Sequence, residues 1–362
     1  MEKKRIVVKI GSSSLTNTQG EIDQNKFSDH IQAVAALRKA GHEVVLVSSG
    51  AVATGFRKLG YPTRPVTLKG KQAAAAVGQS LLIQSYMEQL GNFGIVPAQI
   101  LLTRKDFSKK DRYKNAYATL MELLERGILP IINENDTVSV EELTFGDNDM
   151  LSALVSGLVH ATNLIILTDI NGLYDSNPQT NPGAKRFDEL SEVTADLLQM
   201  AEGAGSNVGT GGMKSKLIAA QTALSLGVKV FIGSGLGSDK LLTILEGHGD
   251  GTYIGNEDMT MVTKNKQWIS LHSQVSGKIF VDEGAERALV SNGSSLLPAG
   301  IYEIKGAFNR GDVVEVFGVN GLLGRGEVLY SDEELKQAMG KRTSELVITS
   351  IEVIHRDKWV KA

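Results

Sequence analysis

The sequence predicts an α/β fold, an open and mostly parallel sheet sandwiched by helices, followed by a small β-rich domain. Through about residue 250, short apolar runs alternate with longer amphipathic stretches, which is the pattern of βαβ units. These apolar runs are rich in Val, Ile and Leu, as strands buried on both faces are. Beyond that point the chain changes to short β-type runs between glycine-rich turns.

Each element of the first domain follows from a local signal. Strands are expected at 6–10, 43–47, 96–102, 128–132, 164–167 and 228–232. Helices are expected at 25–40, 71–90, 112–126 and 215–226, each ending where a left-handed glycine cap is favoured, at Gly41, Gly91, Gly127 and Gly227. The uncharged run 150–168 resembles a membrane span, but 160–163 interrupts it, so a buried helix at 151–158 before the fifth strand is the better interpretation.

The second domain is expected to contain strands at 278–281, 301–304, 313–317 and 327–330. We therefore predict two domains, at residues 1–258 and 274–362. A length of 362 residues agrees with two domains, at about 150 residues per domain.

Composition excludes several classes of protein. With 38 Lys and Arg against 41 Asp and Glu, the net charge of -3 provides no basic surface for nucleic acid or an anionic membrane. The absence of cysteine excludes disulfide scaffolds and thiolate metal sites, and the six histidines show no metal-ligand spacing. The apolar run near the N-terminus is too short for a signal peptide, so we expect a cytoplasmic protein acting on small molecules.

Small and polar residues follow four of the predicted strands. They are Gly11 to Ser14, Ser48 to Ala51, Asn133 to Asp136, and Thr168 with Asp169. Ligands of open α/β sheets bind beyond the carboxyl ends of the strands, which is where these residues are expected. Any one of the four junctions could be an ordinary turn, but four together indicate a site.

Lys9 interrupts an apolar strand, where an unpaired ammonium group is costly to bury. We interpret Lys9 as the partner of an anion, for which phosphate is the natural candidate. The alternative is an edge strand on which the Lys9 side chain reaches solvent.

A glycine-rich loop, Gly209 to Gly212, precedes the helix that carries Lys214 and Lys216. Backbone N–H groups at such a helix start can bind phosphate. Two lysines in a first helical turn oppose the helix dipole unless an anion is bound there. The alternative is a flexible loop with solvated lysines.

Asp149 lies at the start of the buried helix, in the run Gly146-Asp147-Asn148-Asp149. A carboxylate there could fix the ammonium groups of Lys9 and Lys216 against a triphosphate. A purely structural role remains open, because Asp147 or Asn148 can cap the helix and Asp149 gains from its dipole.

These motifs resemble those of the amino acid kinase family, and the chain resembles one group of that family along essentially its whole length. They are the runs beginning VVKIGSS at Val7, VSSGA at Val47, INEND at Ile132, GDNDMLSA at Gly146 and GTGGM at Gly209. The INEND and GDND runs narrow the resemblance to members that act on glutamate. The C-terminal segment resembles a PUA domain in the runs beginning at Val281, Ser294 and Arg310.

The resemblance implies transfer of a phosphoryl group from MgATP to the side-chain carboxylate of L-glutamate, the first committed step toward proline. It assigns phosphoryl transfer to Lys9 and Lys216, with Asp149 orienting both. It assigns glutamate binding to Ser49, Gly50, Ala51, Asp136 and Asn148. It assigns ATP binding to Lys9, Gly11, Thr168, Asp169, Thr210, Gly211, Gly212, Met213, Lys214, Ser215 and Lys216. Mg²⁺ is expected to be held mainly by the ATP phosphates, with no metal site in the protein.

Two alternatives to this activity remain at this point. One is a kinase-like nucleotide sensor with an RNA-binding PUA domain, and the other is a relative acting on another carboxylate such as aspartate. From residue 274 onward there are 11 Lys and Arg and 13 Asp and Glu, a balance of -2, so we expect no functional RNA binding. By resemblance we also expect a homo-oligomer (dimer or tetramer), feedback inhibition by proline, transient contact with glutamyl phosphate reductase, and no membrane.

Overall fold

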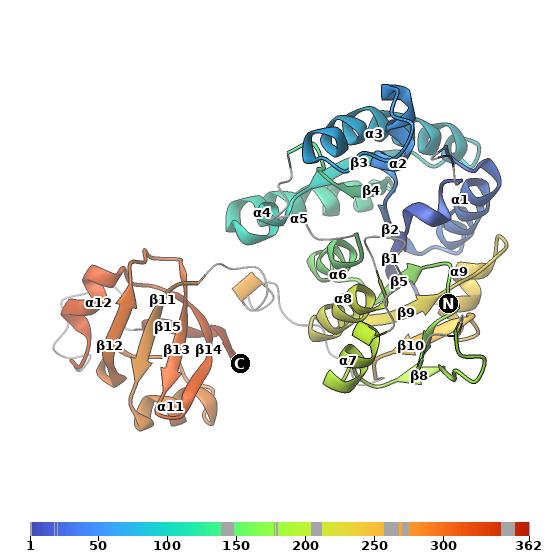
Figure 1. Ribbon diagram of the computed structural model, residues 1–362. Coiled ribbons are helices and arrows are strands. Elements are labelled where there is room, and N and C mark those ends of the chain that lie inside the picture. Colours follow the sequence, from blue (N-terminus) through green and yellow to red (C-terminus); the bar gives the residue numbers. More distant parts are fainter. Residues whose placement is uncertain are drawn as a thin grey trace. The chain divides into compact units, whose positions relative to one another are not determined.

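A computed structural model describes residues 2–17, 19, 21–138, 148–176, 178, 180–203, 212–256, 268–269, 275–341 and 352–361 (Figure 1). The chain forms two compact units. The first contains residues 1–106 and 114–261, and the second contains residues 107–113 and 262–362.

An eight-stranded sheet forms the centre of the first unit, in the order β3-β4-β2-β1-β5-β9-β10-β8. Its pairs are parallel except that β10 runs antiparallel to β9, so the prediction of a mostly parallel sheet is confirmed. The strands are β1 (Arg5–Ile10), β2 (Glu43–Ser48), β3 (Pro97–Leu102), β4 (Leu129–Glu134), β5 (Asn163–Leu167), β8 (Glu189–Leu190), β9 (Lys229–Gly233) and β10 (Gly251–Ile254). A separate hairpin joins β6 (Leu173–Tyr174) and β7 (Arg186–Phe187).

The helices are α1 (Gln24–Lys39), α2 (Ala51–Gly55), α3 (Leu68–Gly91), α4 (Arg104–Ser108), α5 (Lys110–Glu125), α6 (Asn148–Leu158), α7 (Ala195–Gly203), α8 (Met213–Ser225) and α9 (Lys240–Leu245). Short 3₁₀ turns are η1 (Ser12–Ser14) and η2 (Arg57–Leu59). None of the helices in the described part of the chain is long and apolar enough to cross a membrane.

Alternate residues of each strand point to opposite faces of the sheet, and both faces are covered. Ile6, Val8 and Ile10 of β1 share one core with side chains of α1, α3 and α9. On the other face, α6 packs against β1 and β5 and α8 packs against α6. Because β1 lies between β2 and β5, the alternative that Lys9 sits on an edge strand is wrong.

Three of the four predicted glycine caps are confirmed. Gly41, Gly127 and Gly227 have φ values of 91°, 71° and 81°, in the left-handed region. The expectation for Gly91 is wrong, because α3 continues through Gly91 and the left-handed residue after it is Gly94, with φ of 67°. Gly91 tolerates the helical conformation as readily as the left-handed one, so sequence alone could not distinguish the two glycines.

The second unit contains a five-stranded sheet in the order β12-β11-β13-β14-β15. The elements are β11 (Val275–Val281), α11 (Glu283–Val290), η5 (Pro298–Gly300), β12 (Ile301–Gly306), β13 (Val313–Gly318), β14 (Gly321–Val328), α12 (Asp332–Ala338) and β15 (Ile354–Lys361). The strand expected at 327–330 lies instead at 321–328. Its glycines at 321, 324 and 326 mimic a turn in the sequence but pair with β13 across the hairpin.

Candidate functional site

Three charged side chains from distant parts of the first unit meet at the carboxyl end of β1. Lys9 Nζ lies 2.5 Å from Asp149 Oδ1, and Lys216 Nζ lies 2.9 Å from Asp149 Oδ2. The side chain of Asp149 is fully buried, and those of Lys9 and Lys216 are 7% and 10% exposed. The structure thus places the Asp149 carboxylate between the two ammonium groups, and the role of the three residues stays a prediction.

Local structure explains why these side chains converge. Lys9 is the fifth residue of β1 and points to the sheet face on which α6 packs. Asp149 lies in the first turn of α6, and Lys216 lies in the first turn of α8, which packs along α6. The end of β1 and the starts of α6 and α8 therefore bring the side chains of Lys9, Asp149 and Lys216 together.

The charge balance at this point favours an anion. Burial alone would raise the pKa of Asp149, but the ammonium groups of Lys9 and Lys216 lower it below its ordinary value, so the carboxylate stays ionised. One negative and two positive charges leave a net charge of +1 in a largely buried place. A multiply charged anion such as a phosphate group would neutralise the excess.

Backbone amides and small residues border the lysines. A Cβ atom at Gly11 would lie 3.6 Å from Lys9 Nζ, so Gly11 leaves open the approach to the ammonium group. Gly212 precedes α8 as its N-cap residue and provides no side-chain cap, and Ser215 Oγ donates to Gly212 O at 2.8 Å. The backbone amides of Ser215 and Lys216 donate to Gly212 O at 3.2 and 3.5 Å. The dipole of α8 favours an anion near this helix start.

Of the other residues expected at this loop, Met213 and Ser215 are half-buried and Lys214 is exposed. Thr210 and Gly211 lie outside the described residues. Thr168 and Asp169 follow β5, the neighbour of β1, and Thr168 Oγ1 donates to Asp169 Oδ1 at 3.1 Å. They lie at the same edge of the sheet as Lys9, as predicted.

A second cluster is built around the side-chain amide of Asn148. Its Nδ2 atom lies 2.8 Å from Ser48 O, 2.9 Å from Ser49 Oγ and 2.7 Å from Asn133 Oδ1. Asn148 and Ser49 are adjacent, as expected of two residues that bind one ligand. Because Asn148 directly precedes Asp149, this cluster and the ion triad share one helix start.

The turn after Ser49 depends on glycine. Gly50 has φ of 110°, a conformation that other residues rarely adopt, and it lets α2 begin at the buried Ala51. The helix is held by a close crossing with α3, where a Cβ atom at Gly55 would lie 1.9 Å from Ala74 O and one at Gly78 would lie 1.8 Å from Ala51 O. The backbone amides of residues 49–51 are therefore fixed by packing.

Asp136 lies in the turn after β4 and is half-buried. Burial raises its pKa to about 6, although Arg64 opposes this rise. A carboxylate with so little compensation in the protein is suited to receive a positive charge from a ligand. Among the described residues, no hydrogen bond or ion pair joins Asp136 to the Asn148 cluster, and Asp147 lies outside the described residues.

Three residues of the second cluster were not assigned roles by the sequence. Asn133 lies in the INEND run, and the resemblance gives it no role of its own. Gln79 belongs to none of the motifs in the sequence. In the structure its Oε1 accepts a hydrogen bond from Asn133 Nδ2 at 2.8 Å. Tyr86, fully buried on α3, lies 2.9 Å from Ser48 Oγ through its hydroxyl group. No local pattern in the sequence marks Gln79 or Tyr86, because their contacts depend on how α3 packs.

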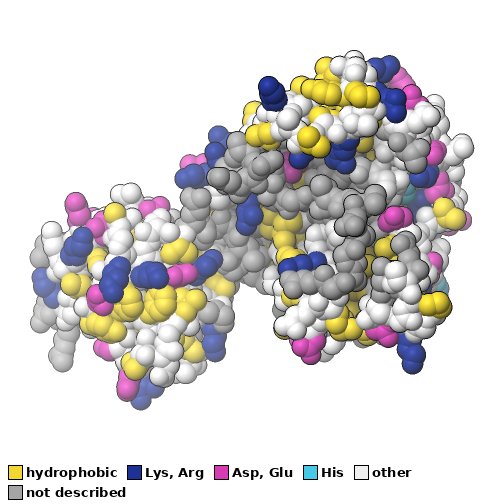
Figure 2. Space-filling view, in the orientation of Figure 1, with side chains coloured by type: hydrophobic (Ala, Val, Ile, Leu, Met, Phe, Trp, Pro, Cys, Tyr) yellow, Lys and Arg dark blue, Asp and Glu magenta, His cyan; other side chains and the backbone are white. Residues whose placement is uncertain are grey.

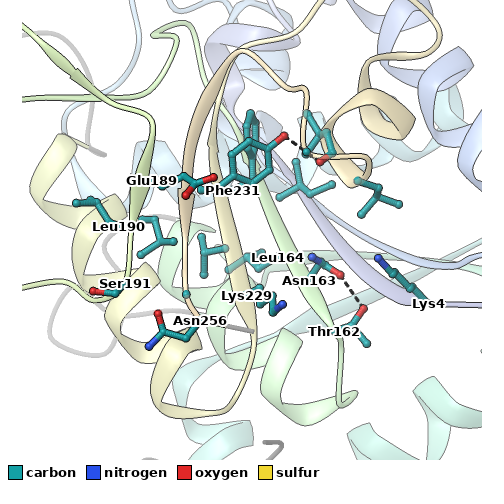
Figure 3. A pocket seen from close by; sticks show the side chains of 18 of the residues that line it. Lys4, Thr162, Asn163, Leu164, Glu189, Leu190, Ser191, Lys229, Phe231 and Asn256 are labelled. Carbon is teal, nitrogen blue, oxygen red and sulfur yellow. Dashed lines mark hydrogen bonds between the residues drawn. The ribbon is translucent and has the colours of Figure 1, made fainter. Parts of the chain in front are cut away.

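A cavity of the first unit lies away from the triad. It has a volume of about 860 Å³ and is lined by Lys4, Asn163 and Lys229, which begin or precede β1, β5 and β9 (Figure 3). Lys9 and Thr168 lie at or beyond the opposite ends of these strands. This cavity therefore lies at the opposite edge of the sheet from the ion triad.

Comparison with known proteins agrees with this geometry. The amino acid kinase family profile matches residues 4–234, and the PUA domain profile matches residues 277–347. Glutamate 5-kinase 1 of Bacillus licheniformis is 67% identical over 361 residues, covering 99% of both chains. Glutamate 5-kinase 1 of Bacillus subtilis is 64% identical with the same coverage, and glutamate 5-kinase of Bacillus cereus strain G9842 is 60% identical, covering 99% of this chain and 100% of its own.

Proposed function

Because the chain belongs to the amino acid kinase family, and within it to the glutamate 5-kinases, we propose that it phosphorylates the side-chain carboxylate of L-glutamate with ATP. The products are L-glutamyl 5-phosphate and ADP, and the reaction is the first step of proline biosynthesis. The observation that carries this proposal is the buried triad, in which Asp149 holds Lys9 and Lys216 at the carboxyl end of the sheet.

The reaction requires alignment and charge neutralisation. The side-chain carboxyl of glutamate is already ionised at neutral pH, so no general base is needed. One of its oxygens bonds to the γ-phosphorus, while the bond from that phosphorus to the β,γ-bridging oxygen breaks and ADP leaves with the electron pair. Lys9 and Lys216 would neutralise the charge on the transferring phosphoryl group, and Asp149 would keep both ammonium groups in place.

The Asn148 cluster is suited to bind glutamate. The Ser49 hydroxyl and the backbone amides of Gly50 and Ala51 would bind a substrate carboxylate, because they are hydrogen-bond donors at a turn held by the α2–α3 crossing. The Ser49 backbone N–H instead donates to Ile10 O at 3.1 Å. Asp136 would pair with the substrate ammonium group, and Asn148 would contribute its amide. The substrate would thus be held beside the lysines.

The nucleotide would extend from the triad along the edge of the sheet. Gly11 and the loop Thr210, Gly211 and Gly212 would bind phosphates, together with Met213 to Lys216 at the start of α8, while Thr168 and Asp169 would bind the remainder of ATP. We propose Mg²⁺ as the companion ion, held mainly by the phosphates. Both Asp149 oxygens are already taken by ammonium groups, and the described residues contain no cluster of three acidic or histidine side chains that could hold a metal.

A hydroxylamine trap tests this activity directly. Purified protein with MgATP and L-glutamate should form glutamyl hydroxamate, because hydroxylamine captures the acyl phosphate. L-Aspartate is the matched control, and one methylene distinguishes it by about 1–3 kcal/mol in a pocket. Absence of hydroxamate with either amino acid, despite ATP binding, would favour the nucleotide-sensor alternative. Hydroxamate from aspartate in preference to glutamate would favour a relative with another substrate.

The pH dependence of glutamate binding is expected to follow Asp136. Its pKa of about 6 means that the carboxylate is protonated as the pH falls below this value, and the attraction to the substrate ammonium is then lost. We expect kcat/KM for glutamate to fall on the acid side with an apparent pKa near 6, while KM for MgATP stays constant. Steady-state assays between pH 5 and 8, at saturating Mg²⁺, measure both quantities.

Asp136→Asn provides the control for this profile. It should show a low kcat/KM for glutamate at every pH and no step near pH 6. Because a raised carboxyl pKa destabilises the folded state above about pH 4, the asparagine variant should melt no lower than the wild type at pH 7. A step near pH 6 that persists in the variant would assign the titration to another group.

Further properties are proposed on the family resemblance. These are a homo-oligomer (dimer or tetramer), inhibition by proline, transient contact with glutamyl phosphate reductase, and a cytoplasmic location. Light scattering and activity at millimolar proline test the first two. We propose no functional RNA binding, because Lys305 and Arg325 on the sheet of the second unit pair with Glu303 and Glu315. Acidic and basic side chains are both present on the face of this unit seen in Figure 2. Salt-sensitive, submicromolar binding of tRNA to a filter would contradict this.

A further inference from the structure

The side-chain amide nitrogen of Asn148 has more oxygen neighbours than it has hydrogens to donate. Its Nδ2 atom carries two hydrogens, but three oxygens lie within 2.9 Å. Ser48 O and Asn133 Oδ1 can only accept, whereas Ser49 Oγ carries a hydrogen of its own. The two amide hydrogens therefore satisfy Ser48 O and Asn133 Oδ1, and the Ser49 hydroxyl is left to donate to a substrate oxygen.

This arrangement requires Asn133 to present its oxygen to Asn148. Asn133 Oδ1 also accepts from the Glu134 backbone N–H at 2.9 Å, and Asn133 Nδ2 donates to Gln79 Oε1 at 2.8 Å. If the Asn133 amide turned over, its NH₂ group would face the NH₂ group of Asn148. Gln79 supplies the acceptor that favours the productive orientation.

Tyr86 contacts Ser48, on the other side of the Asn148 cluster from Gln79 and Asn133. Its hydroxyl group lies 2.9 Å from Ser48 Oγ, and its ring is fully buried against Phe27, with ring centroids 4.6 Å apart. Burial raises the pKa of Tyr86, so the phenol keeps its proton. The Ser48 side chain is thereby fixed at the end of β2, next to the carbonyl oxygen that binds Asn148.

Both side chains come from α3. Residues 79 and 86 are seven positions apart, so they lie on one face of the helix, two turns from each other. Figure 1 shows α3 beside β3 and β4. Helix α3 also packs closely on α2 at the crossing of Gly78 and Gly55. One helix thus contacts the end of β4 through Gln79 and the end of β2 through Tyr86.

We propose that Gln79 and Tyr86 are positioning residues for L-glutamate, which act through Asn133 and Ser48 on the amide of Asn148. This inference rests on the proposed function of the Asn148 cluster. Neither residue approaches the lysine triad through any hydrogen bond among the described residues. Their loss should therefore weaken glutamate binding and leave ATP binding unchanged.

Gln79→Met tests the first arm, because methionine keeps the length of the side chain and removes the acceptor. We expect KM for glutamate to rise about tenfold, with KM for MgATP and kcat at saturating glutamate changed by less than about twofold. Gln79→Glu keeps an acceptor at the same place and should restore KM for glutamate to within about threefold of wild type. Gln84→Met, at an exposed position of the same helix, is the matched control and should match wild type.

Tyr86→Phe tests the second arm by removing only the hydroxyl group, and should raise KM for glutamate about threefold. Calorimetric titration with L-glutamate gives the same comparison without turnover. An unchanged KM in Gln79→Met and Tyr86→Phe, or an equal rise in both substrates' KM values, would overturn the inference. Failure of the wild type to form hydroxamate would instead overturn the proposed function, so the two results are distinguishable.

Discussion

Lys216→Met is expected to lower kcat by about 10²–10³-fold while the protein stays folded. The ammonium group of Lys216 is one of two positive charges at the proposed phosphoryl position, and methionine retains the buried hydrocarbon chain without that charge. Removal of a preorganised charge from a largely buried site acts mainly on the transition state, because charge develops there during transfer. Hydroxamate formation at saturating substrates measures kcat, and circular dichroism verifies folding.

Lys229→Met is the matched control for this substitution. Lys229 begins β9 and lines the cavity at the opposite edge of the sheet, so its loss should leave kcat within about twofold of wild type. A Lys216→Met enzyme with nearly normal kcat would show that Lys9 alone suffices, and that the second lysine has a structural role.

Asp149→Asn is expected to damage both stability and activity. It leaves the ammonium groups of Lys9 and Lys216 side by side without a counter-charge, and breaking a buried pair in this way costs about 3–5 kcal/mol. Chemical denaturation measures the change in the free energy of unfolding. Because ATP phosphates would supply the missing negative charge, saturating ATP should raise the melting temperature of the variant more than that of wild type.

Asp29→Asn separates the two effects of that substitution. Asp29 pairs with the buried Lys240 between α1 and α9, away from the triad. Its loss should lower stability and leave kcat unchanged. If Asp149→Asn also retained normal kcat at a temperature where it is folded, Asp149 would be a structural residue only.

The sequence was informative where local rules determine the outcome. Lys9 in an apolar strand and Asp149 in a first helical turn are anomalies visible within a few residues, and parallel strands bring their carboxyl ends to one edge. The strands expected from the apolar runs lie within about two residues of the observed strands in the first unit. Helix α2 was missed because five residues after Gly50 show no helical period.

The contacts of α3 could not be predicted in the same way. Gln79 meets Asn133 across 54 residues, and Tyr86 meets Ser48 across 38. In the sequence, Gln79 is one of several glutamines on a long helix, and nothing local separates it from those exposed to solvent. Only the packing of α3 on α2, with Gly78 against Ala51, fixes the register that brings these groups together.

The ion triad also has a consequence for the order of folding. Asp149 contacts Lys216 across 67 residues, and Lys9 comes from the first strand of the chain. The helices and single strands can form early, but the triad exists only after α8 has docked on α6 and β1 has entered the sheet. Regained phosphotransferase activity during refolding should therefore lag behind the recovery of helical signal, and a nascent chain that ends before α8 should have no activity.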